Sequence, residues 1–190
     1  MSHTRIRGIR GKAALAVCGL TAATVIPLAA SGTAHAAPYC GITWGSSAKT
    51  SAALTSDTVR GVRSGQHTCY DRLVIDLGGY GRSTGYRVRY VSTVTGPSGT
   101  PMSLSGGARL QIDVNAAATD SQGRPTYRPA DPRHAANVAG FRTFRQVAYV
   151  ASFEGHTTFG LGVRARLPMR VFVLQDTKGQ RLVIDVAHKW

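Results

Sequence analysis

The pentapeptide Arg72-Leu73-Val74-Ile75-Asp76 (RLVID) occurs a second time at residues 181–185, close to the end of the 190-residue chain. In each copy, the leucine and the isoleucine fall on one face of an extended segment, and the arginine, valine and aspartate fall on the other. This alternation predicts two β-strands, each with one buried face. Because the copies are identical, we expect them to occupy related positions in the two halves of the fold.

A glycine-rich segment follows the first copy, and residues 81–85 (GRSTG) within it fit the G-x-S-x-G pattern of a serine-hydrolase nucleophile elbow. Such an elbow requires a helix after the turn, whereas residues 86–90 alternate as a further strand. Asp185 and His188 follow Ser83 in the hydrolase order, but they lie too close together to come from separate loops. We therefore interpret Ser83 as part of a hairpin loop and predict no catalytic residue and no enzymatic activity.

Alternation with a period of two also dominates the rest of the chain, and no segment shows a convincing helical stripe. The pattern predicts about eight strands, at residues 58–62, 72–77, 86–90, 109–114, 147–153, 159–163, 169–173 and 182–186. The predicted fold class is all-β, a two-sheet β-sandwich or a partly open barrel. The polar segment 115–140 is an unusually long connection, for which a plain loop and a short helix at residues 132–138 are both compatible with the sequence.

The first 36 residues have the organisation of a secretory signal peptide: a basic head, an apolar run at residues 13–30 and a small-x-small cleavage signal at residues 34–36. A retained membrane anchor is the alternative, but Thr21, Thr24 and Pro27 interrupt the apolar run. We predict cleavage after Ala36, export without a membrane anchor, and one domain at residues 37–190. A chain of this length is sufficient for a single core.

Two cysteines, Cys40 and Cys69, remain after the predicted cleavage. A disulfide between them is the expected state in an oxidising compartment. The chain has no C-x-x-C motif and no paired-histidine spacing, so we predict neither a metal site nor a cofactor.

Asp71 shares a strand face with the apolar residues of the first RLVID copy, where a carboxylate without a partner would be costly. Arg63 and His67 are near in sequence and are the expected partners, while Glu154 and Arg164 form a second candidate polar pair. Two interpretations of these five residues remain open: ion pairs that close one end of the sandwich, or a ligand-binding site.

The predicted mature chain keeps 19 basic and 9 acidic residues, a net charge of +10, because the signal segment contains four basic and no acidic residues. Such a charge favours polyanions, whether nucleic acid, anionic lipid or the phosphate polymers of the wall. An exported protein meets the wall polymers first, so we predict no nucleic-acid partner. A solvated basic surface without a partner is the alternative. Strand parity points four candidate polyanion contacts outward: Arg87, Arg89, Arg164 and Arg166.

Two further expectations concern individual side chains. Pairing of Leu77 with Tyr86 across the glycine turn would place Asp76 opposite Arg87, in a cross-strand ion pair. If binding depends on a shaped groove rather than on charge, Trp44 and Tyr80 are the aromatic candidates.

Five segments of the chain carry a resemblance to a known family: residues 40–45 (CGITWG), 62–76 (VRSGQHTCYDRLVID), 85–91 (GYRVRYV), 153–164 (FEGHTTFGLGVR) and 181–186 (RLVIDV). Together they resemble the AMIN-like domain of secreted actinobacterial proteins. The resemblance implies a β-sandwich module without known catalytic activity. The related AMIN domains localise exported wall enzymes and secretin-type assemblies to the envelope, partly through peptidoglycan.

The resemblance and the charge together predict a secreted, non-catalytic binding module that associates with the cell envelope. The expected ligand is a cell-wall polymer, either peptidoglycan or an anionic polymer of the teichoic-acid type. A small extracellular enzyme, or an interaction or inhibitor domain that binds another secreted protein, is the alternative. The sequence makes no prediction of the oligomeric state.

Overall fold

The computed structural model describes residues 38–190, except for residues 54–56, 80–83 and 178. The predicted signal peptide and the two loop residues Tyr80 and Ser83 therefore lie outside the described residues. Within the described part of the chain, no helix has the length and hydrophobicity needed to span a bilayer.

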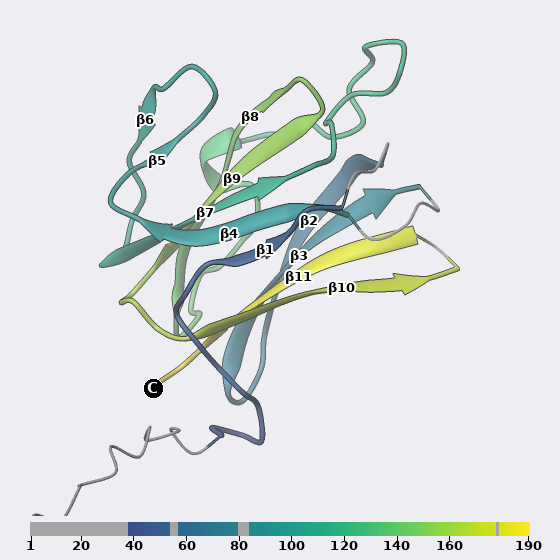
Figure 1. Ribbon diagram of the computed structural model, residues 1–190. Coiled ribbons are helices and arrows are strands. Elements are labelled where there is room, and N and C mark those ends of the chain that lie inside the picture. The colour runs from purple at the N-terminus through teal and green to yellow at the C-terminus, as the bar shows by residue number, and fades with distance from the viewer. Residues whose placement is uncertain (1–37, 54–56, 80–83, 178) are drawn as a thin grey trace, which may run out of the picture. The chain divides into compact units, whose positions relative to one another are not determined.

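Two antiparallel sheets pack face to face as a β-sandwich (Figure 1). The five-stranded sheet has the order β1-β4-β7-β9-β8, the four-stranded sheet has the order β10-β11-β3-β2, and β5 and β6 form a small hairpin. The strands of the five-stranded sheet are β1 (Lys49–Ser51), β4 (Tyr86–Val91), β7 (Ala108–Val114), β9 (His156–Val163) and β8 (Phe144–Phe153). Those of the four-stranded sheet are β10 (Met169–Asp176), β11 (Gly179–Ala187), β3 (Tyr70–Gly78) and β2 (Thr58–Gln66), and the hairpin consists of β5 (Val94–Thr95) and β6 (Pro101–Met102).

The predicted all-β sandwich is confirmed, and each of the eight predicted strands corresponds to one of the eight longer strands. The sequence pattern missed β1, β5 and β6, which have two or three residues each and are too short to show an alternation. In the segment 115–140, the only regular element among the described residues is a single 3₁₀ turn, Pro132–His134.

The core fills the space between the two sheets and follows directly from the alternation in the strands. Both sheets contribute fully buried side chains, among them Leu73, Ile75, Leu182 and Ile184 from the four-stranded sheet and Leu110, Ile112, Phe159 and Leu161 from the five-stranded sheet. Burial of this apolar area is the main favourable term in the stability of the fold.

The two RLVID copies are neighbouring antiparallel strands, β3 and β11, at the centre of the four-stranded sheet. Val74 pairs with Val183, so that each arginine of one copy lies opposite the aspartate of the other copy. The two copies are therefore related by a local twofold axis within one sheet. The expectation that they occupy related positions in two halves of the fold is wrong. The expected pairing of Asp76 with Arg87 is wrong, because β3 and β4 belong to different sheets.

The long segment 115–140 covers the open side of the sandwich, where β2 and β8 are the edge strands of their sheets. Hydrogen bonds tie the segment to both edges: Thr126 Oγ1 to Val59 O at 2.8 Å, Ser64 Oγ to Asn137 O at 2.6 Å, and Ala135 N to Val147 O at 2.8 Å. Its apolar side chains, including Tyr127, Val138 and Phe141, pack against the core. The segment joins β7 to β8 within the five-stranded sheet, and it is long because it also reaches β2, the edge strand of the other sheet.

Tyr127 of this segment carries a buried hydroxyl group that has no hydrogen-bond partner among the described residues. Its ring packs edge-on against Tyr149, with the ring centroids 5.7 Å apart. Burial, with a smaller effect of Tyr149, raises the pKa of Tyr127 to about 12. The folded protein therefore holds this proton more tightly than the unfolded chain does.

At pH 7, we expect the free energy of unfolding of Tyr127→Phe to equal that of the wild type or to exceed it slightly. The aromatic ring stays in place, and a hydroxyl group without a hydrogen-bond partner is removed. Between the ordinary tyrosine pKa of about 10 and the folded value, unfolding releases the Tyr127 proton, so rising pH destabilises the wild type. The variant should lose less stability in this range. Urea unfolding at pH 7 and pH 11 measures the difference, and an equal alkaline loss in both proteins would contradict the prediction.

Candidate functional site: an arginine-rich sheet face

The outward side of the four-stranded sheet is occupied by arginine side chains. Because the leucine and isoleucine of each RLVID copy point into the core, Arg72 and Arg181 point to the opposite face. Neighbouring strands add further arginines, and we call the resulting surface the arginine face, defined by Arg60, Arg63, Arg72, Arg170 and Arg181.

At one end of the arginine face, two arginines share one carboxylate. Asp185 accepts hydrogen bonds from Arg72 Nε and Nη2 at 2.6 and 2.9 Å, and from Arg170 Nε at 2.7 Å. The two guanidinium groups cover Asp185 completely, although it lies on the outer face. The hydrogen bonds to Asp185 raise the pKa of Arg72, so the guanidinium group stays charged.

Aromatic rings hold these two arginines in place. The guanidinium carbon of Arg170 lies 5.0 Å from the ring centroid of Phe172, 5.3 Å from that of Tyr70 and 5.7 Å from that of Trp44. Arg72 approaches Tyr70 and Phe172 in the same way. These cation–π contacts restrict both side chains, and the aromatic candidate Trp44 contributes to them through Arg170.

Of the remaining arginines of the face, Arg60 and Arg63 are exposed, whereas Arg181 is half-buried like Arg170. Arg63 forms a bidentate pair with Asp76, with Nε–Oδ2 and Nη2–Oδ1 distances of 2.8 and 3.0 Å, and this hydrogen bonding raises its pKa. Arg181 pairs with Asp176. Arg60 lies across the backbone of Gly78, where any Cβ would collide with its guanidinium group. Arg60 forms no ion pair with any described residue.

A groove runs between these side chains. One hollow of about 290 Å³ has a floor formed by Val74 and Val183 and includes Arg63, Arg72 and Arg181 in its walls. A second hollow of about 550 Å³ extends toward the strand ends at Gly78 and Gly179. Both hollows contain Arg63 and Arg181 in their linings, so they adjoin.

The chemistry of this groove suits the binding of anions. Its walls offer guanidinium donors that match the oxygens of phosphate or carboxylate groups. No group of three or more histidine, cysteine, aspartate or glutamate side chains that could hold a metal ion occurs within the part of the chain that the structure describes.

Asp71 is fully buried at the opposite side of β3, as expected, but its partners differ from the predicted ones. Its Oδ1 lies 2.9 Å from His188 Nε2, and its Oδ2 accepts hydrogen bonds from the backbone N–H groups of Thr143 and Phe144 at 2.6 and 2.9 Å. The expected partners, Arg63 and His67, both belong to the exposed surface, where Arg63 binds Asp76 and His67 stacks on Tyr70. Asp71 is thus a structural junction between β3, the end of β11 and the start of β8.

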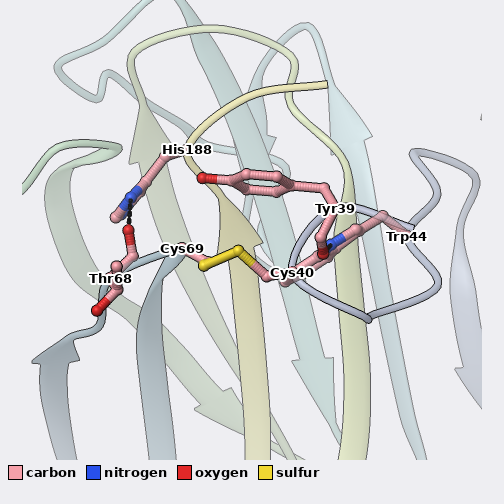
Figure 2. Close-up of a disulfide and its surroundings, with 6 residues drawn as sticks. All are labelled: Tyr39, Cys40, Trp44, Thr68, Cys69 and His188. Carbon is pink, nitrogen blue, oxygen red and sulfur yellow. Dashed lines mark hydrogen bonds between the residues drawn. A yellow bond between two sulfur atoms is a disulfide. The ribbon is translucent and has the colours of Figure 1, made fainter. Parts of the chain in front are cut away.

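The predicted disulfide between Cys40 and Cys69 is present, with a Cα–Cα distance of 6.4 Å. Figure 2 shows it between the N-terminal segment that carries Tyr39 and Trp44 and the loop that leads into β3. On the same loop, the carbonyl oxygen of Thr68 lies 3.2 Å from His188 Nδ1. The disulfide therefore fixes the loop next to the Asp71–His188 contact.

The second predicted polar pair does not form. Glu154 is exposed in the turn that leads into β9, whereas Arg164 follows the other end of β9 and donates a hydrogen bond to the carbonyl oxygen of His188. The five residues of the predicted polar cluster, Arg63, His67, Asp71, Glu154 and Arg164, are therefore divided among separate places in the fold.

The four predicted polyanion contacts also do not form one surface. Arg87 and Arg89 point outward from β4 on the five-stranded sheet, and Arg89 pairs with Asp113 at 2.6 Å. Arg164 and Arg166 lie in the connection between β9 and β10, where Arg166 packs over the ring of Tyr90. Contact of these four arginines with a polyanion remains a prediction.

Of the arginine face, only Arg63 was among the site residues predicted from the sequence; Arg60, Arg72, Arg170 and Arg181 were not. One signal was available: two copies of RLVID aligned as antiparallel partners put Arg72 opposite Asp185. The part played by Arg60 depends on a bulge between Val59 and Gly61, which the sequence pattern does not reveal.

Comparison with known proteins gives one informative match. No curated protein matches the chain. The family model of the AMIN-like domain matches residues 57–188, well over half of the chain, and this range contains all strands of the four-stranded sheet. AMIN-like domains are typically non-catalytic modules associated with the cell envelope. The resemblance seen in the sequence is thereby confirmed, and the chain belongs to the AMIN-like domain family.

Proposed function

We propose that this protein is a secreted, non-catalytic binding module that associates with the cell envelope by binding an anionic wall polymer along the arginine face. The observation that carries the proposal is the continuous groove whose two hollows share Arg63 and Arg181. The family and the disulfide support an envelope location, because disulfides persist in oxidising, extracellular compartments.

The arginines of the groove keep hydrogen-bond donors for a ligand although carboxylates neutralise part of their charge. A guanidinium group has five N–H donors, and a bidentate carboxylate such as Asp76 uses two of those of Arg63. The remaining donors can bind phosphate or carboxylate oxygens of a polymer. The carboxylates on the protein orient the guanidinium groups and reduce the conformational entropy lost on binding.

The wild-type protein should sediment together with isolated wall sacculi. The double variant Arg63→Gln/Arg181→Gln should bind the sacculi at least about tenfold more weakly, because hydrogen bonds to charged groups contribute about 1.5–3 kcal/mol each. Raising the salt concentration from 0.1 M to 1 M should also release the protein, since the Debye length falls from about 10 Å to about 3 Å. Sacculi stripped of phosphate polymers should retain less protein. Pelleting followed by quantification of bound protein measures all three effects.

Arg87→Gln/Arg89→Gln is the matched control, because it removes the same charge from the outer face of the other sheet. On the proposal that the arginine face carries the binding, and contrary to the sequence-based prediction for Arg87 and Arg89, this variant should bind nearly as well as the wild type. Both variants should keep the wild-type melting temperature within a few degrees. Equal losses in the two variants would show that only net charge matters. A loss confined to the control would instead favour Arg87 and Arg89 as contacts, and a wild type that fails to pellet would contradict the proposed function.

A further inference from the structure

The arginines of the arginine face are arranged as a ladder along the sheet. The outward positions of β3 define four levels: Arg72, Val74, Asp76 and Gly78. Arg72 itself occupies the first level, and Arg63 of β2 lies opposite Val74 at the second level. Arg181 of β11 lies opposite Asp76 at the third level, and Arg60 lies across Gly78 at the fourth level. Successive outward levels of a strand are about 7 Å apart, so the backbone supplies one arginine for about every 7 Å of groove.

Each arginine of the ladder keeps hydrogen-bond donors for a ligand. Arg63 and Arg72 use Nε and Nη2 for their carboxylates, so that their Nη1 groups make no hydrogen bond to a described residue. Arg60, at the end of the ladder, has no ion pair within the described part of the chain. The charges of the arginine face do not cancel, because its five arginines face three carboxylates, Asp76, Asp176 and Asp185.

The floor of the groove accommodates a slim chain. Val74 and Val183 lie at its centre; they are buried, with exposed fractions of 6% and 1%, and offer no polar group to a ligand. On the β2 side, Gly61 and Gly65 leave the backbone uncovered, and a Cβ at either position would meet nothing closer than 3.6 Å. A polymer backbone can therefore run along the uncovered glycine side of the groove while its anionic groups reach the arginines.

We propose that the arginine face binds a linear phosphodiester polymer of short polyol units, in which successive phosphates occupy successive levels of the ladder. This inference rests on the proposed function and specifies its ligand. In such a polymer, a few carbon atoms separate neighbouring charges, and each phosphate offers two free oxygens to an arginine fork. A carboxylated polysaccharide places whole sugar rings between its charges, and inorganic polyphosphate places its charges on directly linked phosphates.

The test measures the affinity of the mature protein for three polyanions at constant salt: poly(glycerol phosphate), hyaluronan and inorganic polyphosphate, each labelled at one end for fluorescence anisotropy. Poly(glycerol phosphate) should bind at least about tenfold more tightly than either polymer of equal total charge. Its affinity should rise with each added phosphate up to four, the number of levels, and then change only slightly.

Arg60→Gln gives a sharper readout, because Arg60 forms the last level and takes no part in the core. In this variant the rise in affinity should end at three phosphates, whereas Arg87→Gln should leave the four-phosphate limit unchanged. The two variants lose the same charge, so a general charge effect would shift both curves alike.

The outcomes separate this inference from the proposed function. Similar affinities for the three polymers, or an affinity that keeps rising steeply beyond four phosphates, would overturn the ladder even if sacculi still bind through Arg63 and Arg181. Tight binding to hyaluronan alone would overturn it in favour of a carboxylated ligand. Failure of the wild type to bind sacculi would overturn the proposed function itself.

Discussion

Asp71→Ala should lower the free energy of unfolding by about 3–5 kcal/mol, the cost typical of breaking a buried pair by removing one partner. The fully buried carboxylate accepts hydrogen bonds from two backbone N–H groups and contacts His188, so its loss leaves three buried polar groups without their partner. Urea denaturation followed by tryptophan fluorescence measures the effect. Binding to sacculi should fall only under conditions in which the variant unfolds.

Asp76→Ala is the matched control, because Asp76 lies on the same strand but on the outer face, in an exposed pair with Arg63. A pair of this kind contributes about 0–1 kcal/mol. The two variants should therefore differ by several kcal/mol in stability. Equal stabilities would contradict the role of Asp71 as a junction between strands.

Loss of the disulfide should have the second large effect, a destabilisation of about 3–4 kcal/mol on the chain-entropy model. Cys40 and Cys69 are 29 residues apart, and their bond ties the N-terminal segment to the loop before β3. Unfolding of the wild type with and without a reductant gives the size of the effect. Cys40→Ala/Cys69→Ala should match the reduced wild type and should not respond to the reductant.

A single-cysteine variant, Cys40→Ala, separates chain entropy from local packing. If the bond acts mainly on the unfolded chain, the single and double variants should be equally destabilised and should retain the same native spectrum. A double variant as stable as the oxidised wild type would contradict the stabilising role of the disulfide.

Much of the fold could be predicted from the sequence because its strands alternate so regularly. The eight longer strands, the sandwich, the disulfide and the family all followed from residues 40–186 read as a pattern. The pairing of strands was less accessible, because alternation fixes which face a residue occupies but not which strand lies beside it. For this reason Asp76 was assigned to Arg87 on β4, although its partner is Arg63 on β2.

The candidate site was predicted less well than the fold, for the same physical reason. The burial of Asp71 followed from its position in the strand, but His188 is 117 residues away and only the pairing of β3 with β11 brings it near. The arginine face likewise gathers side chains from four strands. The long segment 115–140 gave no signal of its role, since it covers two sheet edges through irregular contacts.

β3 and β11 share the five residues RLVID, which makes their antiparallel pairing self-complementary over this segment. Because RLVID pairs with RLVID in antiparallel register, these five residues of β3 can pair with the same residues of another chain in the way they pair with β11. The native contact joins residues 113 positions apart, so it forms late compared with local hairpins. Intermolecular pairing competes during that interval, and its rate grows with concentration. Dilute refolding, or export of one chain at a time, therefore favours the native sheet over strand-exchanged dimers.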